Sequence, residues 1–278
     1  MTAQLNPRGD VAVLVPAAGA GLRLGPGGPK ALRLLAGEPL LAHTVRRIAA
    51  APSVRVIVVA APAAEVDAVR ALLAPIAPVT VVPGGAERQH SVAAALAVVP
   101  EDVRIVLVHD AARALAPPEL IESVAAAVRA GRPAVIPVLP IVDTIKEVGP
   151  GLGLDAPGLA SVAAGADGRA PGFASVAAGA DGRAPLGLAP VPAGVGGPVE
   201  VVVGTVDRSV LRSVQTPQGF RREVLIAAHA DGFGAHTDDA GMVEKAGIPV
   251  TCVPGSELAM KITRPLDLVI AEALLPVA

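Results

Sequence analysis

The stretch VAVLVPAAGAGLRLGPGGPKAL, residues 11–32, places a run of small and β-branched residues directly before a glycine-rich loop. A continuous apolar run of this kind is typical of a strand that helices cover on both faces. A glycine-rich loop after such a strand is typical of phosphate binding, because glycine lets backbone N–H groups approach an anion closely. The stretch therefore predicts an α/β fold with a phosphate site at the end of its first strand.

Similar apolar runs recur along the chain and alternate with amphipathic segments rich in alanine and leucine. We expect strands at 11–18, 54–62, 79–85, 103–112, 134–140 and 248–255. We expect helices at 40–51, 63–75, 90–98, 117–131, 221–231, 238–247 and 265–276, the last with Thr263 as its cap and Pro265 in its first turn. The alternation predicts a three-layer α/β fold with a mostly parallel sheet, which binds ligands beyond the carboxyl ends of its strands.

The composition limits the classes of function. The 278 residues are 52% hydrophobic, which is enough for a sizeable core, and their formal net charge is −2. This charge gives no basic footprint for nucleic acid. The sequence contains neither an apolar stretch long enough for a membrane span nor the pattern of a signal peptide. With one cysteine, Cys252, no internal disulfide can form, so we expect a cytoplasmic protein that binds neither nucleic acid nor membrane.

One region departs from the alternating pattern. The segment ASVAAGADGRAP occurs at 160–171 and again at 174–185, a tandem duplication with a 14-residue period. From 149 to 197 the chain consists mostly of Gly, Ala and Pro, and such a segment buries too little surface to offset its ordering entropy. We interpret 149–197 as a flexible insertion within a single domain spanning 1–278. A binding element built from the repeat is the alternative.

The glycine-rich loop fails two familiar patterns. A Walker loop needs Ser or Thr after its lysine, but Lys30 is followed by alanine. A dinucleotide loop needs a third glycine where this chain has Leu24. The loop still suits a polyphosphate, because Gly19 and Gly21 permit a nest of backbone amides and Arg23 and Lys30 supply positive charge.

Polar side chains follow other strands as well. Asp110 ends the apolar run VRIVLVHD, where a carboxylate beside a phosphate loop either binds Mg²⁺ or caps the next helix. We expect its neighbour His109 to be packed rather than catalytic. Ser91, in GGAERQHSV (84–92), either hydrogen-bonds a ligand or caps a helix.

The motifs of the C-terminal half have ordinary structural interpretations when each is taken alone. Asp238 and Asp239, in TDDAGMVE, are expected to cap a helix. The segments 140–148 and 204–220, which flank the insertion, look like solvated strands of a projecting hairpin. A lone lysine such as Lys261, just before the last helix, normally faces solvent.

The ordered set of motifs is more specific than any one of them. The set comprises PAAGAGLRLGPGGPKAL, GGAERQHSV, VHDAARAL, VDTIKEV, TVDR…VQTPQGF, TDDAGMVE and MKITRPLDL. It resembles the 2-C-methyl-D-erythritol 4-phosphate cytidylyltransferase family of the non-mevalonate isoprenoid pathway, over residues 11–276 apart from the insertion. The resemblance implies a Rossmann-like, GT-A-like nucleotidyltransferase fold with a projecting β-arm at 140–210. It also implies a nucleotidyltransferase that uses Mg²⁺ to transfer CMP from CTP to 2-C-methyl-D-erythritol 4-phosphate and releases pyrophosphate.

The resemblance also implies roles for individual residues. The nucleotide would contact Ala17, Ala18, Gly19, Gly21, Gly85, Ala86, Ser91 and Asp110, with Asp110 also at the metal. The catalytic cations would be Arg23, Lys30, Lys261 and Arg208. The sugar-alcohol phosphate would be held by Arg113, Thr144, Arg208 and Thr216. Family members are homodimers whose arms complete each other's sites, so the arm residues would act in the neighbouring subunit.

Two features depart from the family pattern. Position 259 is alanine, where many members carry asparagine two residues before the lysine, and the insertion lengthens the arm. Three other functions remain as alternatives. One is a cytidylyltransferase for another polyol phosphate such as ribitol 5-phosphate, which the arm motifs weakly disfavour. A non-catalytic nucleotide-binding protein conflicts with the joint presence of Arg23, Lys30, Asp110 and Lys261, and a dinucleotide-dependent reductase conflicts with Leu24.

Overall fold

The computed structural model describes residues 2–24, 28–150, 200–230 and 238–277. Its contacts divide the chain into two units, Met1–Ile141 with Leu211–Ala278 and, separately, Val142–Val210. The expected insertion at 149–197 lies almost entirely outside the described residues.

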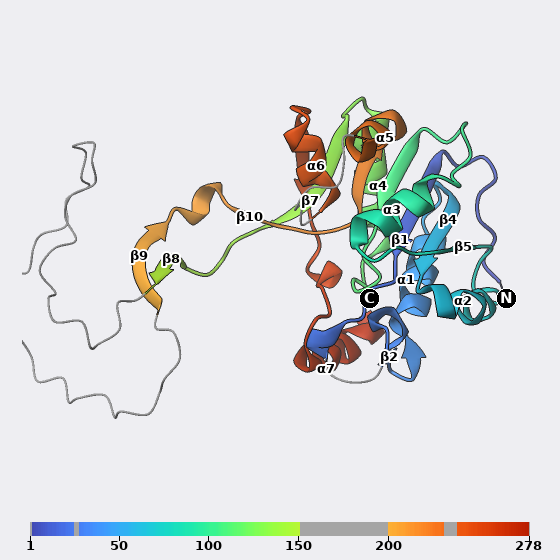
Figure 1. The fold of residues 1–278 in the computed structure, drawn as a ribbon, viewed down its shortest axis with the longest axis horizontal. Coiled ribbons are helices and arrows are strands. Elements are labelled where there is room, and N and C mark those ends of the chain that lie inside the picture. Colours follow the sequence, from blue (N-terminus) through green and yellow to red (C-terminus); the bar gives the residue numbers. More distant parts are fainter. Residues whose placement is uncertain (1, 25–27, 151–199, 231–237, 278) are drawn as a thin grey trace, which may run out of the picture. The chain divides into compact units, whose positions relative to one another are not determined.

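The larger unit is built on an eight-stranded sheet (Figure 1). Its strands are β1 (Val11–Pro16), β4 (Val54–Ala61), β5 (Thr80–Pro83), β6 (Ile105–Val108), β7 (Ala134–Pro140), β10 (Arg212–Val214), β11 (Gln218–Arg221) and β12 (Val250–Pro254). They lie in the order β10-β7-β11-β6-β1-β4-β5, and β12 also pairs with β7. All six strands expected from the apolar runs are present.

The sheet is mixed, and four of the seven strand pairings described for it are parallel, in line with the mostly parallel sheet that the sequence predicts. Strands β5, β4, β1 and β6 run parallel to one another, and β12 runs parallel to β7. Strand β11 is antiparallel to both β6 and β7, and β10 is antiparallel to β7. The parallel half thus carries the phosphate loop, and the antiparallel strands come from the chain that follows the smaller unit.

Helices cover both faces of the sheet, as the continuous apolar strands predict (Figure 1). They are α1 (Leu40–Ala49), α2 (Val66–Leu73), α3 (Arg88–Leu96), α4 (Pro118–Arg129), α5 (Arg222–Ala230), α6 (Asp239–Lys245) and α7 (Pro265–Leu274). In β1, Val11, Val13 and Val15 pack with residues of α1, α2 and α4. Ala12 and Leu14 pack on the other face with residues of α3, α5 and α6. Neither face of β1 reaches water, so alternation of polar and apolar residues is absent from it.

Strand β11 corrects the interpretation of 204–220 as a solvated hairpin strand. Gln218, Gly219 and Phe220 are buried, with Phe220 between β6 and β7 in register with Val106 and Ala134. A Cβ on Gly219 would lie 2.5 Å from a methyl carbon of Val124 in α4, so glycine lets the helix pack close to the strand. A short strand that includes glutamine and glycine has no apolar signature, which is why the sequence does not indicate it.

The ends of two helices also differ from expectation. Asp238 caps α6, accepting a hydrogen bond from the Gly241 N–H, but Asp239 is fully buried and forms ion pairs instead. The cap position of α7 is Arg264, not Thr263. The Thr263 hydroxyl donates to the Asp267 carboxylate, which also accepts from the backbone N–H groups of Thr263 and Arg264.

Near the phosphate loop, helix α7 packs in an apolar cluster that is separate from the two clusters on the faces of the sheet. Leu24, Leu35 of β2 (Leu34–Leu35) and Ala271 of α7 are buried in this cluster. Strand β2 forms a two-stranded ribbon with β3 (Glu38–Pro39). Leu24 thus serves packing at the position where a dinucleotide loop would have glycine.

The smaller unit contains an antiparallel pair, β8 (Ile145–Pro150) and β9 (Glu200–Val206). Ile145 pairs with Val206 and Pro150 with Glu200. The Lys146 Nζ donates to the Thr205 hydroxyl across the pair. The valines Val148, Val201, Val202 and Val203 are exposed.

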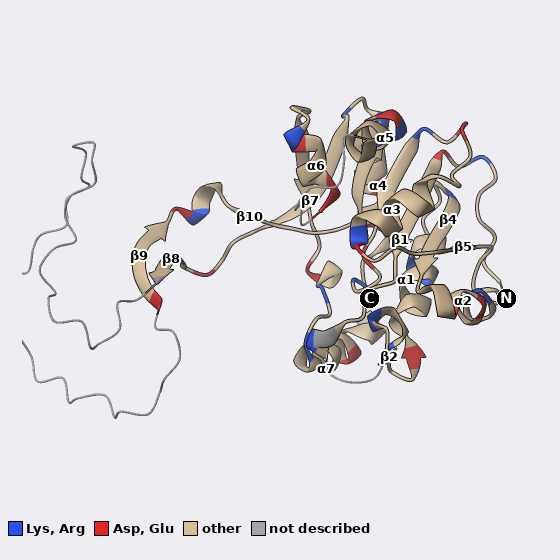
Figure 2. Ribbon diagram, viewed as in Figure 1, with Lys and Arg blue, Asp and Glu red and all other residues tan. Residues whose placement is uncertain are grey.

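Charged residues of both signs are distributed over the helices and loops (Figure 2). Among the described residues, no helix is both long enough and apolar enough to span a membrane.

Candidate active site

A cavity of about 550 Å³ opens where β1, β5 and β6 end. Its walls include the expected nucleotide-binding residues and three expected cations: Ala17, Ala18, Gly19, Gly21, Gly85, Ala86, Ser91, Asp110, Arg23, Lys30 and Lys261. These residues come from four separate stretches of sequence. The carboxyl ends of neighbouring parallel strands bring them together, as the strand order requires.

The glycine-rich loop is shaped around Lys30. Gly21 has a φ of +71°, and a Cβ there would lie 2.4 Å from the Lys30 Cβ. The Lys30 N–H donates to the Gly19 carbonyl at 3.1 Å, which closes the loop on itself. Glycine at 21 is therefore required both by the backbone conformation and by the close approach of Lys30.

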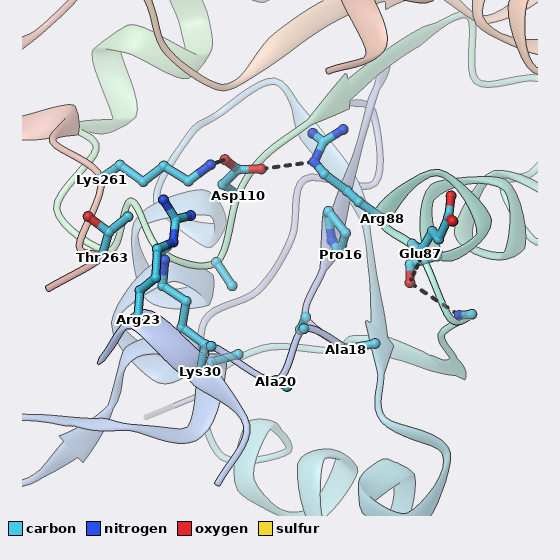
Figure 3. Close-up of a pocket in the computed structure, with 18 of the residues that line it drawn as sticks. Pro16, Ala18, Ala20, Arg23, Lys30, Glu87, Arg88, Asp110, Lys261 and Thr263 are labelled. Atoms are coloured by element: carbon cyan, nitrogen blue, oxygen red, sulfur yellow. Dashed lines mark hydrogen bonds and ion pairs between the residues drawn. The ribbon is translucent and has the colours of Figure 1, made fainter. Parts of the chain in front are cut away.

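Three of the four cations that line the cavity are the ones the sequence predicts, and they come from two segments (Figure 3). Arg23 and Lys30 come from the glycine-rich loop, and Lys261 comes from the segment before α7. Burial, together with the nearby positive charges of Lys261 and Arg23, lowers the pKa of Lys30 to about 8 against the opposing effect of Asp110. The positive charges gathered around Lys30 favour the binding of an anion.

Asp110 lies between two of the cavity's cations (Figure 3). Its Oδ2 is 2.8 Å from the Lys261 Nζ, and its Oδ1 is 3.3 Å from the Arg88 Nε. Burial alone would raise the pKa of Asp110, but Arg88, Lys261 and Arg113 together hold it well below its usual range. The carboxylate is therefore ionised at neutral pH.

Arg88 and Asp239 are residues that sequence reasoning missed. Arg88 begins α3 and lines the cavity, and its Nη1 lies 2.6 Å from Oδ2 of the buried Asp239. Arg88 lies in the motif GGAERQHSV and Asp239 in the motif TDDAGMVE. The two residues are 151 positions apart in the sequence, and a single sequence does not reveal that their side chains form an ion pair.

Ser91 supports the loop between β5 and α3. Its hydroxyl accepts a hydrogen bond from the Gly85 N–H at 3.2 Å and donates to the Glu87 carbonyl at 3.3 Å. A Cβ on Gly84 would lie 2.6 Å from the Ala18 Cβ and 2.9 Å from the Ser91 hydroxyl. The two glycine-containing loops therefore pack tightly against each other at one wall of the cavity.

Thr216 lies behind Asp110 and is not one of the residues that line the cavity. Its hydroxyl accepts from the Asp110 N–H at 3.0 Å and lies 3.2 Å from the His109 Nδ1. His109 is buried, as expected, and burial lowers its pKa to about 4. A neutral, packed histidine at this position supports the Asp110 backbone.

Arg113 is also outside the lining and holds the Lys261 segment. Its Nη1 donates to the Ala259 carbonyl at 2.6 Å and its Nη2 to the Val214 carbonyl at 3.1 Å. The Ile262 N–H donates to the Ala112 carbonyl at 2.9 Å. At position 259 the backbone rather than the side chain makes the contact, and the buried alanine is compatible with it.

Thr144 and Arg208 belong to the smaller unit. Thr144 is exposed, and the Arg208 Nη1 donates to the Val142 carbonyl within that unit. Their expected role at the substrate phosphate stays a prediction.

The cavity combines backbone amides, the four cations Arg23, Lys30, Arg88 and Lys261, and the carboxylates of Asp110 and Glu87. Across the residues that the structure describes, no three His, Cys, Asp or Glu side chains gather into a metal site. Positive charge concentrated in a partly dry cleft stabilises a bound polyphosphate and the extra charge that develops on it during reaction. The arrangement is suited to phosphoryl or nucleotidyl transfer.

The sequence profile of the 2-C-methyl-D-erythritol 4-phosphate cytidylyltransferase family (IspD) matches residues 11–158 and 195–276. The protein of this description from Frankia casuarinae is 50% identical over 270 residues, covering 97% of this chain and 82% of its own. The one from Saccharopolyspora erythraea is 47% identical, covering 96% of this chain and 99% of its own.

Solved structures show the same fold. The crystal structure of 2-C-methyl-D-erythritol 4-phosphate cytidylyltransferase from Thermus thermophilus is similar with a TM-score of 0.62 at 32% identity, covering 96% of this chain and 99% of that one. A 4-diphosphocytidyl-2C-methyl-D-erythritol synthase from Anaerococcus prevotii superposes with a TM-score of 0.68 at 21% identity, again over 96% of this chain and 99% of that one.

Proposed function

The chain belongs to the 2-C-methyl-D-erythritol 4-phosphate cytidylyltransferase family, and from this premise we propose how its cavity carries out the reaction. It is an enzyme of the non-mevalonate isoprenoid pathway. Its substrates are CTP and 2-C-methyl-D-erythritol 4-phosphate, and its products are 4-diphosphocytidyl-2-C-methyl-D-erythritol and pyrophosphate. The observation that carries the assignment of the site is the gathering of Arg23, Lys30, Lys261 and Asp110 around one cavity.

The triphosphate of CTP binds on the glycine-rich loop. The backbone from Ala17 to Gly21 forms the cradle. The Ala17 N–H donates to the Ala60 carbonyl, so the N–H groups from Ala18 to Gly21 face the phosphate oxygens, and Arg23 and Lys30 neutralise their charge. The bound triphosphate keeps Lys30 protonated, because a nearby anion raises a lysine pKa that burial has lowered. Lys261 leaves Asp110 and moves to the α-phosphate, where negative charge develops during the reaction.

The substrate's phosphate attacks the α-phosphorus, and pyrophosphate leaves. The attacking oxygen is already ionised, so the enzyme needs no general base, in agreement with the packed, neutral His109. Both reactants are polyanions, and the barrier therefore includes their mutual repulsion. Arg23, Lys30 and Lys261 offset that repulsion and stabilise the five-coordinate transition state.

Asp110 is the residue that would hold Mg²⁺. Its carboxylate is ionised and lies at the wall of the cavity, and Mg²⁺ bound by one carboxylate takes its remaining ligands from water and substrate phosphates. A cluster of three protein ligands is therefore unnecessary, and the donors present fit the ion. When bound, Mg²⁺ supplies charge neutralisation between the phosphates. Lys261, which pairs with Asp110 in this structure, would leave that carboxylate available to the ion when it turns to the nucleotide.

Backbone groups of Gly85 and Ala86 read the cytosine edge. The Ser91 hydroxyl is engaged with Gly85 and Glu87, so we assign it to the shape of this loop as well as to the base. The chain has no Trp or Tyr, and selection of cytosine therefore depends on backbone hydrogen bonds and on the limited size of the pocket.

We propose that Thr144 and Arg208 hold the substrate's phosphate. Arg113 and Thr216, whose side chains already bond backbone groups behind the cavity wall, would support that site. We propose a homodimer in which the arm at 140–210 supplies Thr144 and Arg208 to the neighbouring site. Support comes from the exposed valines of β8 and β9, because an isolated two-stranded pair is only marginally stable and gains from pairing with another surface. We also propose a cytoplasmic location, in agreement with the single cysteine.

Release of pyrophosphate tests the function directly. Purified protein with CTP, MgCl₂ and a panel of polyol phosphates is expected to release pyrophosphate fastest with 2-C-methyl-D-erythritol 4-phosphate. Faster release with ribitol 5-phosphate would overturn the substrate assignment. Unchanged turnover after Arg23→Ala or Lys30→Ala would remove the role given to that cation.

A further inference from the structure

Four charged side chains form a line of alternating sign that begins in the cavity and ends in the protein interior. Lys261 contacts Asp110 at 2.8 Å, Asp110 contacts Arg88 at 3.3 Å, and Arg88 contacts Asp239 at 2.6 Å. The four residues come from the segment before α7, the end of β6, the start of α3 and the start of α6. Asp239 is the member farthest from solvent, with a side chain that is 0% exposed.

Helix α6 does not depend on Asp239 for its N-terminal cap. Asp238 already caps α6 through the Gly241 N–H, and its other oxygen accepts from the Gln218 Nε2 at 2.7 Å. The Asp239 Oδ1 lies 3.4 Å from the Nε2 of the buried His229, and its Oδ2 lies 2.6 Å from the Nη1 of Arg88. A fully buried ion pair is seldom more stable than apolar side chains of the same volume, so stability alone gives little reason for a carboxylate here.

The two cations on Asp110 differ in their freedom to move. Lys261 has a side chain that is 43% exposed, and Asp110 is the ion-pair partner found for it among the described residues. Arg88 is 27% exposed and is held at both ends of its guanidinium, by Asp110 on Nε and by Asp239 on Nη1. A guanidinium fixed by two carboxylates at once has little freedom to turn toward a third anion.

We propose that Asp239 is a positioning residue that holds Arg88 on Asp110 and away from the nucleotide's phosphates. Arg88 lines the cavity, so without Asp239 it would turn to the triphosphate, which carries more negative charge than one carboxylate. Asp110 would then lose the partner that orients it, and the nucleotide would be bound in a second, unproductive arrangement. With Asp239 present, Lys261 is the cation that transfers from Asp110 to the nucleotide. This inference rests on the proposed placement of the triphosphate and of Asp110.

The first test compares Asp239→Asn with Asp238→Asn, two identical changes of charge at adjacent positions. Asparagine keeps the volume of both side chains and at 238 preserves the cap on the Gly241 N–H, while giving up the hydrogen bond accepted from the Gln218 Nε2. We expect Asp239→Asn to lower kcat by roughly 10- to 100-fold, the usual effect of removing a group that orients a ligand-binding residue, while KM for CTP stays equal or falls. Asp238→Asn should leave both constants near wild type. Equal constants for the two variants, or a loss expressed only as a higher KM, would overturn the proposal.

The second test asks whether Asp239 acts through Arg88. In an Arg88→Gln background, Asp239→Asn is expected to have no further effect on kcat, because the guanidinium that it holds is gone. The double variant also has no unpaired buried charge, so it is expected to fold even if a single variant does not. Full turnover by the double variant, or a further loss from Asp239→Asn in the Arg88→Gln background, would contradict the proposal. Unchanged turnover in Asp110→Asn would instead contradict the proposed role of Asp110. This variant therefore distinguishes a failure of the proposed function from a failure of the inference about Asp239.

Discussion

The Nζ of Lys261 lies 2.8 Å from Oδ2 of Asp110, so the lysine assigned to the α-phosphate is paired with the carboxylate assigned to the metal. The pair holds the segment before α7 next to the end of β6. In the proposed complex, Lys261 would pair with a phosphate of the nucleotide and Asp110 with the cation, so one ion pair would be exchanged for two.

Removing the positive charge of Lys261 is expected to affect turnover more than binding. We expect Lys261→Met to lower kcat by about 10²- to 10³-fold, the usual loss for one group that stabilises transition-state charge. The measurement is steady-state pyrophosphate release. Lys245→Met, which removes an exposed lysine near the end of α6, is the matched control. Equal kinetics for the two variants would exclude Lys261 from the reaction.

The lowered pKa of Lys30 predicts proton uptake when CTP binds. With a pKa of about 8, part of the free enzyme has a neutral Lys30 at pH 8, and the triphosphate favours the charged form. Binding at pH 8 should therefore take up protons, whereas Lys30 is already protonated at pH 6 and adds no uptake there. Calorimetry in two buffers of different ionisation enthalpy measures the number of protons.

The control for this prediction is Lys30→Arg, because arginine is charged throughout this pH range. We expect the variant to lose the uptake at pH 8 while still binding CTP. The same number of protons in both proteins would show that another group takes them up.

Gly21 is expected to matter because of Lys30 and not only because of its backbone conformation. Gly21 and Gly28 both have positive φ, 71° and 85°, so alanine at either position incurs a strain of roughly 1–2 kcal/mol. A Cβ at 21 also collides with Lys30, whereas a Cβ at 28 meets nothing within 4 Å. We expect Gly21→Ala to lower kcat/KM for CTP by about 10²-fold through displacement of Lys30, and Gly28→Ala to lower it far less. Similar losses in both variants would show that strain alone is responsible.

The parallel half of the sheet and most of the cavity could be predicted from the sequence, because both depend on local patterns. The apolar run of β1 and the glycines after it determine a buried strand and a phosphate loop without reference to distant residues. Asp110 and Lys30 follow from the same reasoning. Strand β11 could not be predicted in this way, because burial of its glutamine and glycine depends on β6, β7 and α4.

Asp239 illustrates the same limit in the site. Aspartate at the start of a helix predicts a cap, and Asp238 satisfies that prediction. The pairing of Asp239 with Arg88 depends on how α6 packs against the start of α3, which local propensity does not determine. Arg113 is similar, because its contacts with the carbonyls of Ala259 and Val214 involve backbone groups that carry no sequence signature.

The last prediction concerns the segment between β8 and β9. The family profile leaves residues 159–194 unmatched, and Pro150 pairs with Glu200, so the chain leaves and re-enters the strand pair at adjacent positions. Removal of 155–195 leaves about eight residues to join the two strands, and a shorter connection lowers the entropy cost of closure by roughly 0.6 kcal/mol for each halving of its length. We therefore expect the deletion to retain kcat and the dimer, and not to lower Tm. Deletion of 174–187, one copy of the 14-residue repeat, is the milder control. Activity and sedimentation velocity check the outcome, and loss of the dimer in the long deletion alone would assign the segment a role in the assembly.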